Sequence, residues 1–194
     1  MNFLAHIYLS FGDPEITLGN FMGDSIKGKQ YLDFPETIQK GVLLHRAIDT
    51  YTDTHPIPKT SSKRLHSRYS HYSRVIVDIY YDHFLAGNWD NYSGVPLSQY
   101  TASFYTLLEE NLNWMPEGIK RMAPYMISDN WLLNYRELEG IERVLTGMDR
   151  RTGHKSGMGE AIVDLQKFYD EFEKEFTLFF DELVIFSRQK LTEL

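Results

Sequence analysis

The sequence of 194 residues contains no cysteine. This absence excludes disulfide bonds, zinc sites built from thiolates and catalysis by a cysteine nucleophile. Any bound metal ion must therefore use histidine and carboxylate ligands, which suit manganese, iron, magnesium or zinc. No apolar run approaches the roughly 18 residues that a transmembrane helix requires, so we expect no membrane span.

The pattern of a secretory signal peptide is also missing. The N-terminal stretch MNFLAHIYLSFGDPE has no basic start and carries His6 and Asp13, which favours a cytoplasmic protein. Cations are outnumbered, since 20 Lys and Arg residues stand against 27 Asp and Glu residues, for a net charge of −7. This balance argues against a general nucleic-acid binder.

Helical periodicity dominates the sequence, and no useful stretch alternates as a β-strand does. We predict an all-α fold in which residues 1–194 form a single compact multi-helix domain. The predicted helices cover residues 2–11, 13–28, 36–54, 62–85, 97–112, 116–126, 129–149 and 158–191. The two prolines of HPIPKTSS, residues 55–62, predict a break between the third and fourth helices.

The predicted helix 36–54 carries acids on the side where its aliphatic residues lie. On a helical wheel, Asp49 lies about 40° and Asp53 about 80° from His45, in the sector that also holds Ile38 and Val42. Buried acids without partners are unfavourable, so a cation should compensate them. The alternative is a salt-bridged helix using Lys40 and Arg46, although both project roughly 100° or more away from His45.

The predicted helix 62–85 repeats this arrangement. His71, Asp78 and Asp82 lie within about 40° of one another, and His83 follows directly. The helix is apolar nearly all round, which predicts that it is buried with its aspartates. Two such helices that face each other would surround a cation with imidazoles and carboxylates.

Several motifs occur in a specific order along most of the chain. They are MNFLAH at 1–6, GNFMGD at 19–24, LLHRAIDTYTDTHP at 43–56, VDIYYDHFLAGNW at 77–89 and SDNWLLNYRELEGIERVLTGMDRR at 128–151. In these motifs the sequence resembles the acyl carrier protein phosphodiesterases, a family similar to the HD-domain metal-dependent phosphohydrolases. The resemblance implies an HD-like helical fold.

The resemblance also implies a reaction, namely hydrolysis of the phosphodiester that joins 4′-phosphopantetheine to the serine of a holo acyl carrier protein. Its products are apo carrier protein and phosphopantetheine. Manganese is the expected metal, with magnesium or ferrous iron as substitutes. The expected partner is the carrier protein, with neither nucleic acid nor membrane. Two alternatives remain: an HD-type hydrolase of nucleotides or other small phosphoesters, and a noncatalytic helical protein that binds a structural ion.

The motifs carry all the candidate site residues except Arg74, which precedes the motif at 77–89. The candidate metal ligands are His6, Asp24, His45, Asp49, Asp82 and His83, and the candidate catalytic residues are Asp49, Arg46 and Arg74. Either arginine can bind a phosphoryl group through two parallel hydrogen bonds.

Residues 55–77 form a basic stretch on an acidic protein. This stretch has no acid and five cations, namely Lys59, Lys63, Arg64, Arg68 and Arg74. Because carrier proteins are acidic, we predict that it is their docking surface. The alternative is an ordinary solvated helix surface.

Overall fold

The computed structural model describes residues 1–194, of which 81% are helical, and it contains no strand. The helices are α1 (Phe3–Tyr8), α2 (Pro14–Phe21), α3 (Glu36–Thr54), α4 (Pro56–Tyr69), α5 (Ser73–Gly87), α6 (Leu97–Asn111), α7 (Glu117–Ser128), α8 (Trp131–Asn134), α9 (Leu138–Arg151), α10 (Ala161–Lys167) and α11 (Tyr169–Glu193). The all-α prediction is confirmed. None of the helices combines the length and the apolar character that crossing a membrane requires.

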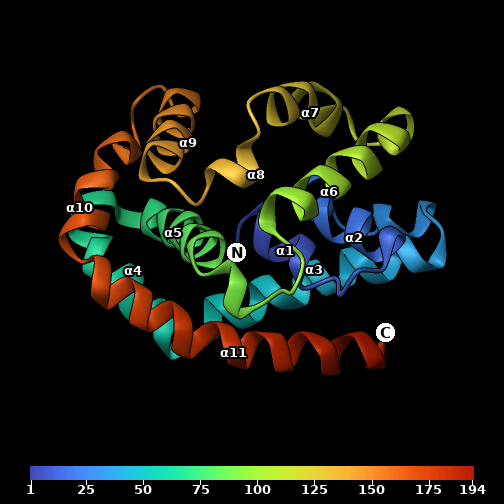
Figure 1. The fold of residues 1–194 in the computed structure, drawn as a ribbon, viewed down its shortest axis with the longest axis horizontal. Coiled ribbons are helices and arrows are strands. Elements are labelled where there is room, and N and C mark those ends of the chain that lie inside the picture. The colour runs from blue at the N-terminus through green and yellow to red at the C-terminus, as the bar shows by residue number, and fades with distance from the viewer.

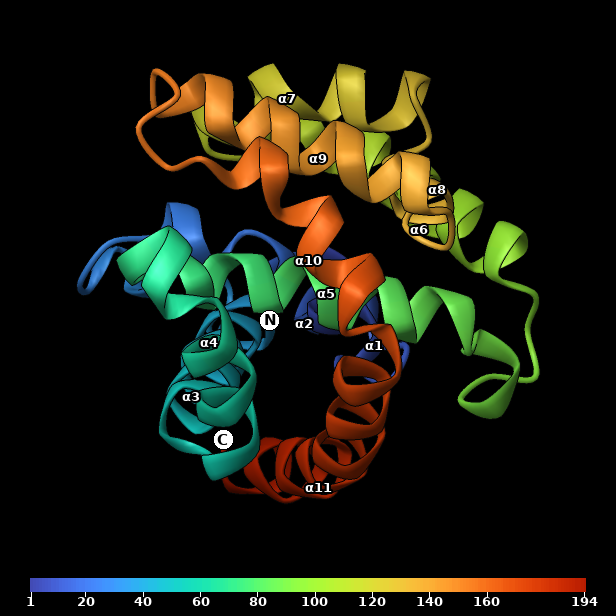
Figure 2. The ribbon, with the colours of Figure 1, turned by 90° about the vertical axis from the view of Figure 1, so that its left-hand side faces the viewer.

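The long helix α11 runs along one side of the molecule, where it packs against α3, α4 and α5 (Figure 1). Helices α6 to α9 gather on the opposite side, and the second view shows them as a layer beyond α1, α2 and α5 (Figure 2). Helix α1 lies in the middle, against α2 and α5. The N-terminal segment is therefore interior to the fold and can supply groups to a central site.

A single cluster of 46 buried apolar residues forms the core. Helix α11 contributes a fully buried aromatic row that includes Phe172, Phe176, Phe179 and Phe180. Each such side chain stabilises the fold by roughly 1.5–3 kcal/mol relative to an exposed one. This row fixes α11 against the helices that carry the polar groups described below.

Helices α2 and α3 approach each other closely because each has a glycine at the contact. A Cβ atom at Gly19 would lie 2.2 Å from the carbonyl oxygen of Ile38, and one at Gly41 would lie 2.4 Å from that of Ile16. Only residues without a side chain fit these positions. The contact brings Asn20, at the end of α2, beside the middle of α3.

The predicted helix 62–85 is wrong as a single element. Helix α4 already begins at Pro56, because a proline fits the first turn of a helix, where no backbone N–H is needed. The side chain of His55 accepts a hydrogen bond from the N–H of Ile57, 3.3 Å away. The helix ends at Tyr69, because the next residue, Ser70, has a φ of 49°, which is not helical; α5 begins at Ser73.

This break moves His71 away from the stripe on which it was predicted. His71 lies in the short 3₁₀ turn Ser70–Tyr72 and is exposed. Two other predicted helices are also split. The segment 129–149 contains α8 and α9, and the segment 158–191 contains α10 and α11, which meet at Phe168.

Candidate metal centre

Two histidines and one aspartate meet at the centre of the molecule. His6 comes from α1, and His45 and Asp49 come from successive turns of α3; their ligand atoms all lie within 4.8 Å of one another. The Nε2 atoms of His6 and His45 lie 3.2 Å and 3.1 Å from the two oxygens of Asp49. The imidazole rings stack with their centroids 4.0 Å apart. Both histidines are buried, whereas the Asp49 side chain is 39% exposed.

Asn20 fixes the orientation of both imidazoles. Its side-chain N–H donates to the carbonyl oxygen of His6 and to Ser10 Oγ, so its Oδ1 is left to accept from Nδ1–H of His6, at 2.8 Å. Its backbone carbonyl accepts from Nδ1–H of His45, also at 2.8 Å. With both Nδ1 atoms used as donors, the Nε2 atoms of the neutral rings carry lone pairs that point at Asp49.

The Nε2 atom of His6 is the unsatisfied polar atom of this group. It is buried and has no hydrogen-bond partner. Burial, with the nearby charge of His45, lowers the pKa of His6 to about 4, which outweighs the opposing effect of Asp49. His6 is therefore neutral at physiological pH, and its lone pair faces a carboxylate. A divalent ion between these atoms would satisfy both.

His45 lies between two carboxylates, those of Asp24 and Asp49. Burial lowers its pKa, but hydrogen bonds with Asp24 and Asp49 outweigh this effect and raise the pKa to about 9. Burial raises the pKa of Asp49, yet contact with His45 and His6 brings it well below the ordinary range. Two carboxylates thus favour positive charge at Nε2. Metal binding releases such a proton, because a metal ion needs the neutral imidazole.

Asp24, a predicted metal ligand, lies beside the cluster. Its Oδ1 is 3.2 Å from Nε2 of His45, and this contact lowers the pKa of Asp24. The preceding Gly23 allows the approach, because a Cβ atom there would lie 2.3 Å from the imidazole of His45. The Asp24 side chain is 81% exposed, so Asp24 lies at the edge of the site that is open to solvent.

Asp78 belongs to the same charge network. The amino group of Met1 lies 3.2 Å from Oδ1 of Asp78 and 3.4 Å from Oδ1 of Asp49. Burial lowers the pKa of this amino group, but the two carboxylates outweigh it and raise the pKa to about 11. The ammonium group thus neutralises part of the acidic charge beside the cluster.

The structure does not bring Asp82 and His83 into the cluster. Both oxygens of the fully buried Asp82 accept backbone hydrogen bonds at the start of α1, from Leu4 at 2.7 Å and Ala5 at 3.1 Å. His83 bonds through Nδ1 to the carbonyl oxygen of Tyr135 and through Nε2 to a tyrosine hydroxyl. Asp82 therefore positions α1, and with it His6, through the backbone.

The two candidate arginines differ in their surroundings. Arg46 donates to the carbonyl oxygen of Ile26 at 2.9 Å and lies over the ring of Tyr31. Arg74 is 61% exposed, and its guanidinium lies 3.6 Å from the exposed carboxylate of Asp53. Neither Lys40 nor Arg46 compensates Asp49 or Asp53, because Lys40 pairs with Glu36 within α3 and Arg46 donates to a backbone carbonyl.

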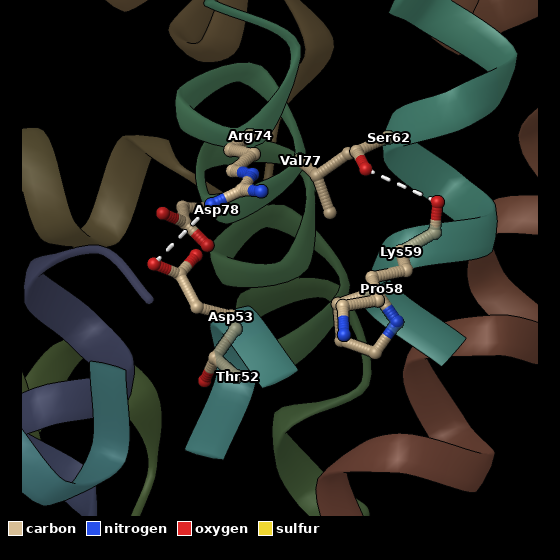
Figure 3. A pocket seen from close by; sticks show the side chains of 8 residues that line it. All are labelled: Thr52, Asp53, Pro58, Lys59, Ser62, Arg74, Val77 and Asp78. Carbon is tan, nitrogen blue, oxygen red and sulfur yellow. Dashed lines mark hydrogen bonds and ion pairs between the residues drawn. The ribbon is translucent and has the colours of Figure 1, made fainter. Parts of the chain in front are cut away.

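Arg74 borders a small hollow between α3, α4 and α5 (Figure 3). Its lining includes Asp53, Lys59, Ser62 and Asp78, and Arg74 and Asp53 point toward each other across it. The cavity volume of about 10 Å³ holds about one water molecule. The hollow is therefore too small to hold a substrate molecule.

Comparison with known proteins identifies the family. The sequence model described as acyl carrier protein phosphodiesterase matches residues 1–183. The chain belongs to this family. A relative from Photorhabdus laumondii is 31% identical over 183 residues, which are 93% of this chain and 91% of the relative. Relatives from an Enterobacter species and from Klebsiella pneumoniae are 28% and 29% identical, each over 98% of this chain and 99% of their own length.

All three relatives are named acyl carrier protein phosphodiesterase. The resemblance of the motifs is thus confirmed, and so is the prediction that the chain is an enzyme. The alternative of a noncatalytic helical protein that binds a structural ion disagrees with membership in a family of enzymes. No solved structure matches the fold, so the relation to HD-domain phosphohydrolases remains a prediction.

Sequence reasoning missed Asn20, although it lies within the GNFMGD motif. An asparagine carries no charge and is an uncommon ligand for a transition metal, so its type gave no signal. A polar residue next to Gly19 in an otherwise apolar segment was the available hint.

Proposed function

We propose that this enzyme hydrolyses the phosphodiester between 4′-phosphopantetheine and the serine of a holo acyl carrier protein in the cytoplasm. Water adds to phosphorus, the bond from phosphorus to the serine oxygen breaks, and the serine oxygen takes up a proton. The products are apo carrier protein and free 4′-phosphopantetheine. The reaction depends on a divalent ion held by His6, His45 and Asp49, with Asp24 at its edge.

One observation carries the metal dependence. Two buried imidazoles, both oriented by Asn20, aim their Nε2 atoms at the same carboxylate of Asp49. Manganese suits this mixed nitrogen and oxygen set, as do magnesium and ferrous iron. A divalent ion here supplies charge neutralisation for the phosphoryl oxygens and activation of water.

The residues around the cluster define where the phosphodiester binds. Asp24 and Asp49 are its exposed members, so the substrate enters on their side. Arg74 is the arginine available for the phosphate, because its pairing with Asp53 is exposed and long at 3.6 Å. Such a pair is weak in water, and the guanidinium can exchange it for the phosphoryl oxygens. Arg46, by contrast, holds the segment after Asp24 in place.

Arg74→Ala should lower kcat/KM for phosphodiester hydrolysis by about 10-fold to 100-fold, because it removes a charge-assisted contact to phosphate. The bound metal content should stay at the wild-type level. Steady-state kinetics and elemental analysis measure the two quantities. Arg136→Ala is the matched control, since Arg136 is comparably exposed and pairs with its neighbour Glu137. Equal kcat/KM values for the two variants would mean that Arg74 does not bind the phosphate.

The function itself is tested by incubation of the protein with holo carrier protein and Mn²⁺, followed by mass spectrometry. We expect the carrier protein to lose the mass of 4′-phosphopantetheine, and we expect a chelator to prevent this loss. An unchanged carrier protein with full hydrolysis of a small phosphodiester would favour the small-phosphoester alternative. Undiminished loss after exhaustive chelation would exclude the metal dependence.

A further inference from the structure

The reaction places the carrier protein close to the metal centre. In the proposed substrate, the phosphorus atom is joined directly to the side-chain oxygen of a serine on the carrier surface. The phosphorus cannot reach the cluster unless the backbone around that serine comes within one side-chain length of it. The surface that borders the open edge of the site must therefore touch the carrier protein.

The open edge is at Asp24, and the chain continues from there as an exposed segment. Residues 27–33 lie between the short turn that carries Asp24 and the start of α3, and Lys27 to Gln30 are all exposed. Arg46 of α3 holds this segment in place, because its guanidinium donates to the carbonyl oxygen of Ile26 and lies over the ring of Tyr31. The segment is thus a fixed surface next to the cluster.

Three cations on this side form no ion pair in the structure, namely Lys27, Lys29 and Arg121. Arg121 is included in this group because α7 lies close to the turn that carries Asp24. A Cβ atom at Gly118 would be 3.9 Å from Ser25 Oγ, and Arg121 follows Gly118 by one helical turn. Within the segment 27–33 two lysines face one acid, Asp33, so this segment is positively charged on a protein whose net charge is −7. Uncompensated cations attract an acidic partner.

Apolar side chains accompany these cations. Leu32 is 55% exposed, and Trp114, in the turn after α6, is 38% exposed. The rings of Phe34 and Trp114 lie 6.0 Å apart, so the segment 27–34 and the turn after α6 adjoin each other. Exposed apolar groups rimmed by cations are typical of a protein-binding surface.

The basic stretch 55–77 has a different environment from the one its sequence indicates. Its arginines pair with acids from other segments: Arg64 with Glu175, Arg68 with Asp164 and Arg74 with Asp53. Lys59 donates to the carbonyl oxygen of Thr54. Neither Lys59 nor Lys63 forms an ion pair. The stretch has no acid in its sequence, but acids from other segments neutralise its three arginines.

We propose that the docking surface for the acidic carrier protein consists of Lys27, Lys29, Leu32, Trp114 and Arg121. This proposal rests on the proposed function and replaces the prediction that the carrier protein docks on residues 55–77. The unpaired cations steer and hold the acidic surface around the modified serine, and the apolar pair contacts the partner's own apolar side chains.

The test compares two double charge reversals that are equal in charge. The first is Lys27→Glu with Lys29→Glu, and the matched control is Lys63→Glu with Lys155→Glu, two exposed lysines that form no ion pair. We expect the first to raise KM for holo carrier protein by about tenfold or more, and the control to change it by less than about twofold. Hydrolysis of bis(p-nitrophenyl) phosphate should stay within about twofold of wild type in both, since that reporter needs no docking surface.

Binding of fluorescein-labelled apo carrier protein, measured by anisotropy, makes the same comparison without turnover. This measurement tests docking even if the wild-type enzyme does not hydrolyse the phosphodiester of the carrier protein. That failure of hydrolysis would count against the proposed function and not against the docking surface. The proposal is overturned if the control pair weakens binding as much as the first pair, or if neither pair weakens it. Weaker binding confined to the first pair supports it.

Discussion

Alanine at His45 or at Asp49 is expected to abolish metal binding and phosphodiesterase activity while the helical content stays unchanged. Each residue supplies an atom of the cluster, and the cluster has only His6 and Asp24 besides. Loss of a group that merely orients a ligand costs about 10-fold to 100-fold in metal affinity, so loss of a ligand should cost more than 100-fold. Elemental analysis, activity with Mn²⁺ and circular dichroism measure the three quantities.

His71→Ala is the matched control for this prediction. His71 is exposed in the turn between α4 and α5, and only its place on the predicted stripe with Asp78 and Asp82 made it a candidate. We expect its metal content and activity to equal those of the wild-type protein. If both cluster variants retain the metal ion and full activity, the metal centre lies elsewhere in the molecule.

The sequence predicted the faces of individual helices well. The helical wheel of α3 placed His45 and Asp49 together, and the structure joins them at 3.1 Å. The same periodicity predicted that Asp82 is buried, which is confirmed. Asp53 differs, because it lies near the end of α3 and is exposed. Periodicity reports which way a side chain points, and burial also depends on what lies beyond it.

Helical periodicity could not predict which segments contact each other in the fold. Asn20 orients His6 and His45 only because Gly19 and Gly41 let α2 and α3 approach, and nothing local in the sequence encodes that distance. The partner of Asp82 was equally hidden, since it consists of backbone N–H groups that every residue has. A buried acid therefore predicted that a partner exists without identifying it as a metal ion or a helix terminus.

Asp82→Ala is expected to lower the free energy of unfolding by about 3 kcal/mol or more, because it leaves two buried N–H groups without acceptors. These N–H groups belong to Leu4 and Ala5, so α1 should loosen and carry His6 away from the cluster. Metal affinity should then fall, although Asp82 binds no metal. Urea unfolding with a chelator present measures the stability without the contribution of bound metal.

Asp82→Asn separates the hydrogen bonds from the charge. The amide keeps one acceptor oxygen, so its loss of stability should lie between those of wild type and Asp82→Ala. Metal affinity should follow the same order. If Asp82→Ala unfolds at the wild-type urea concentration, then α1 is held by its apolar contacts, and the role of Asp82 as an anchor is wrong.

The pH dependence of stability gives a second and independent check on Asp82. Burial raises its pKa from 3.8 to about 7, although the two N–H groups and the amino group of Met1 oppose the shift. The neutral carboxyl is thus the form that the fold favours. Its contribution to stability is complete below about pH 4 and is lost as the pH rises through about 7.

The wild-type protein should therefore lose stability relative to Asp82→Asn as the pH increases from 4 to 8, by at most about 1.4 kcal/mol per pH unit. The amide cannot ionise, so the variant lacks this component, while all other titrating groups are shared. Urea unfolding of both proteins at several pH values gives the difference directly. A difference that stays constant from pH 4 to pH 8 would mean that Asp82 is ionised throughout, with α1 bound to a buried negative charge.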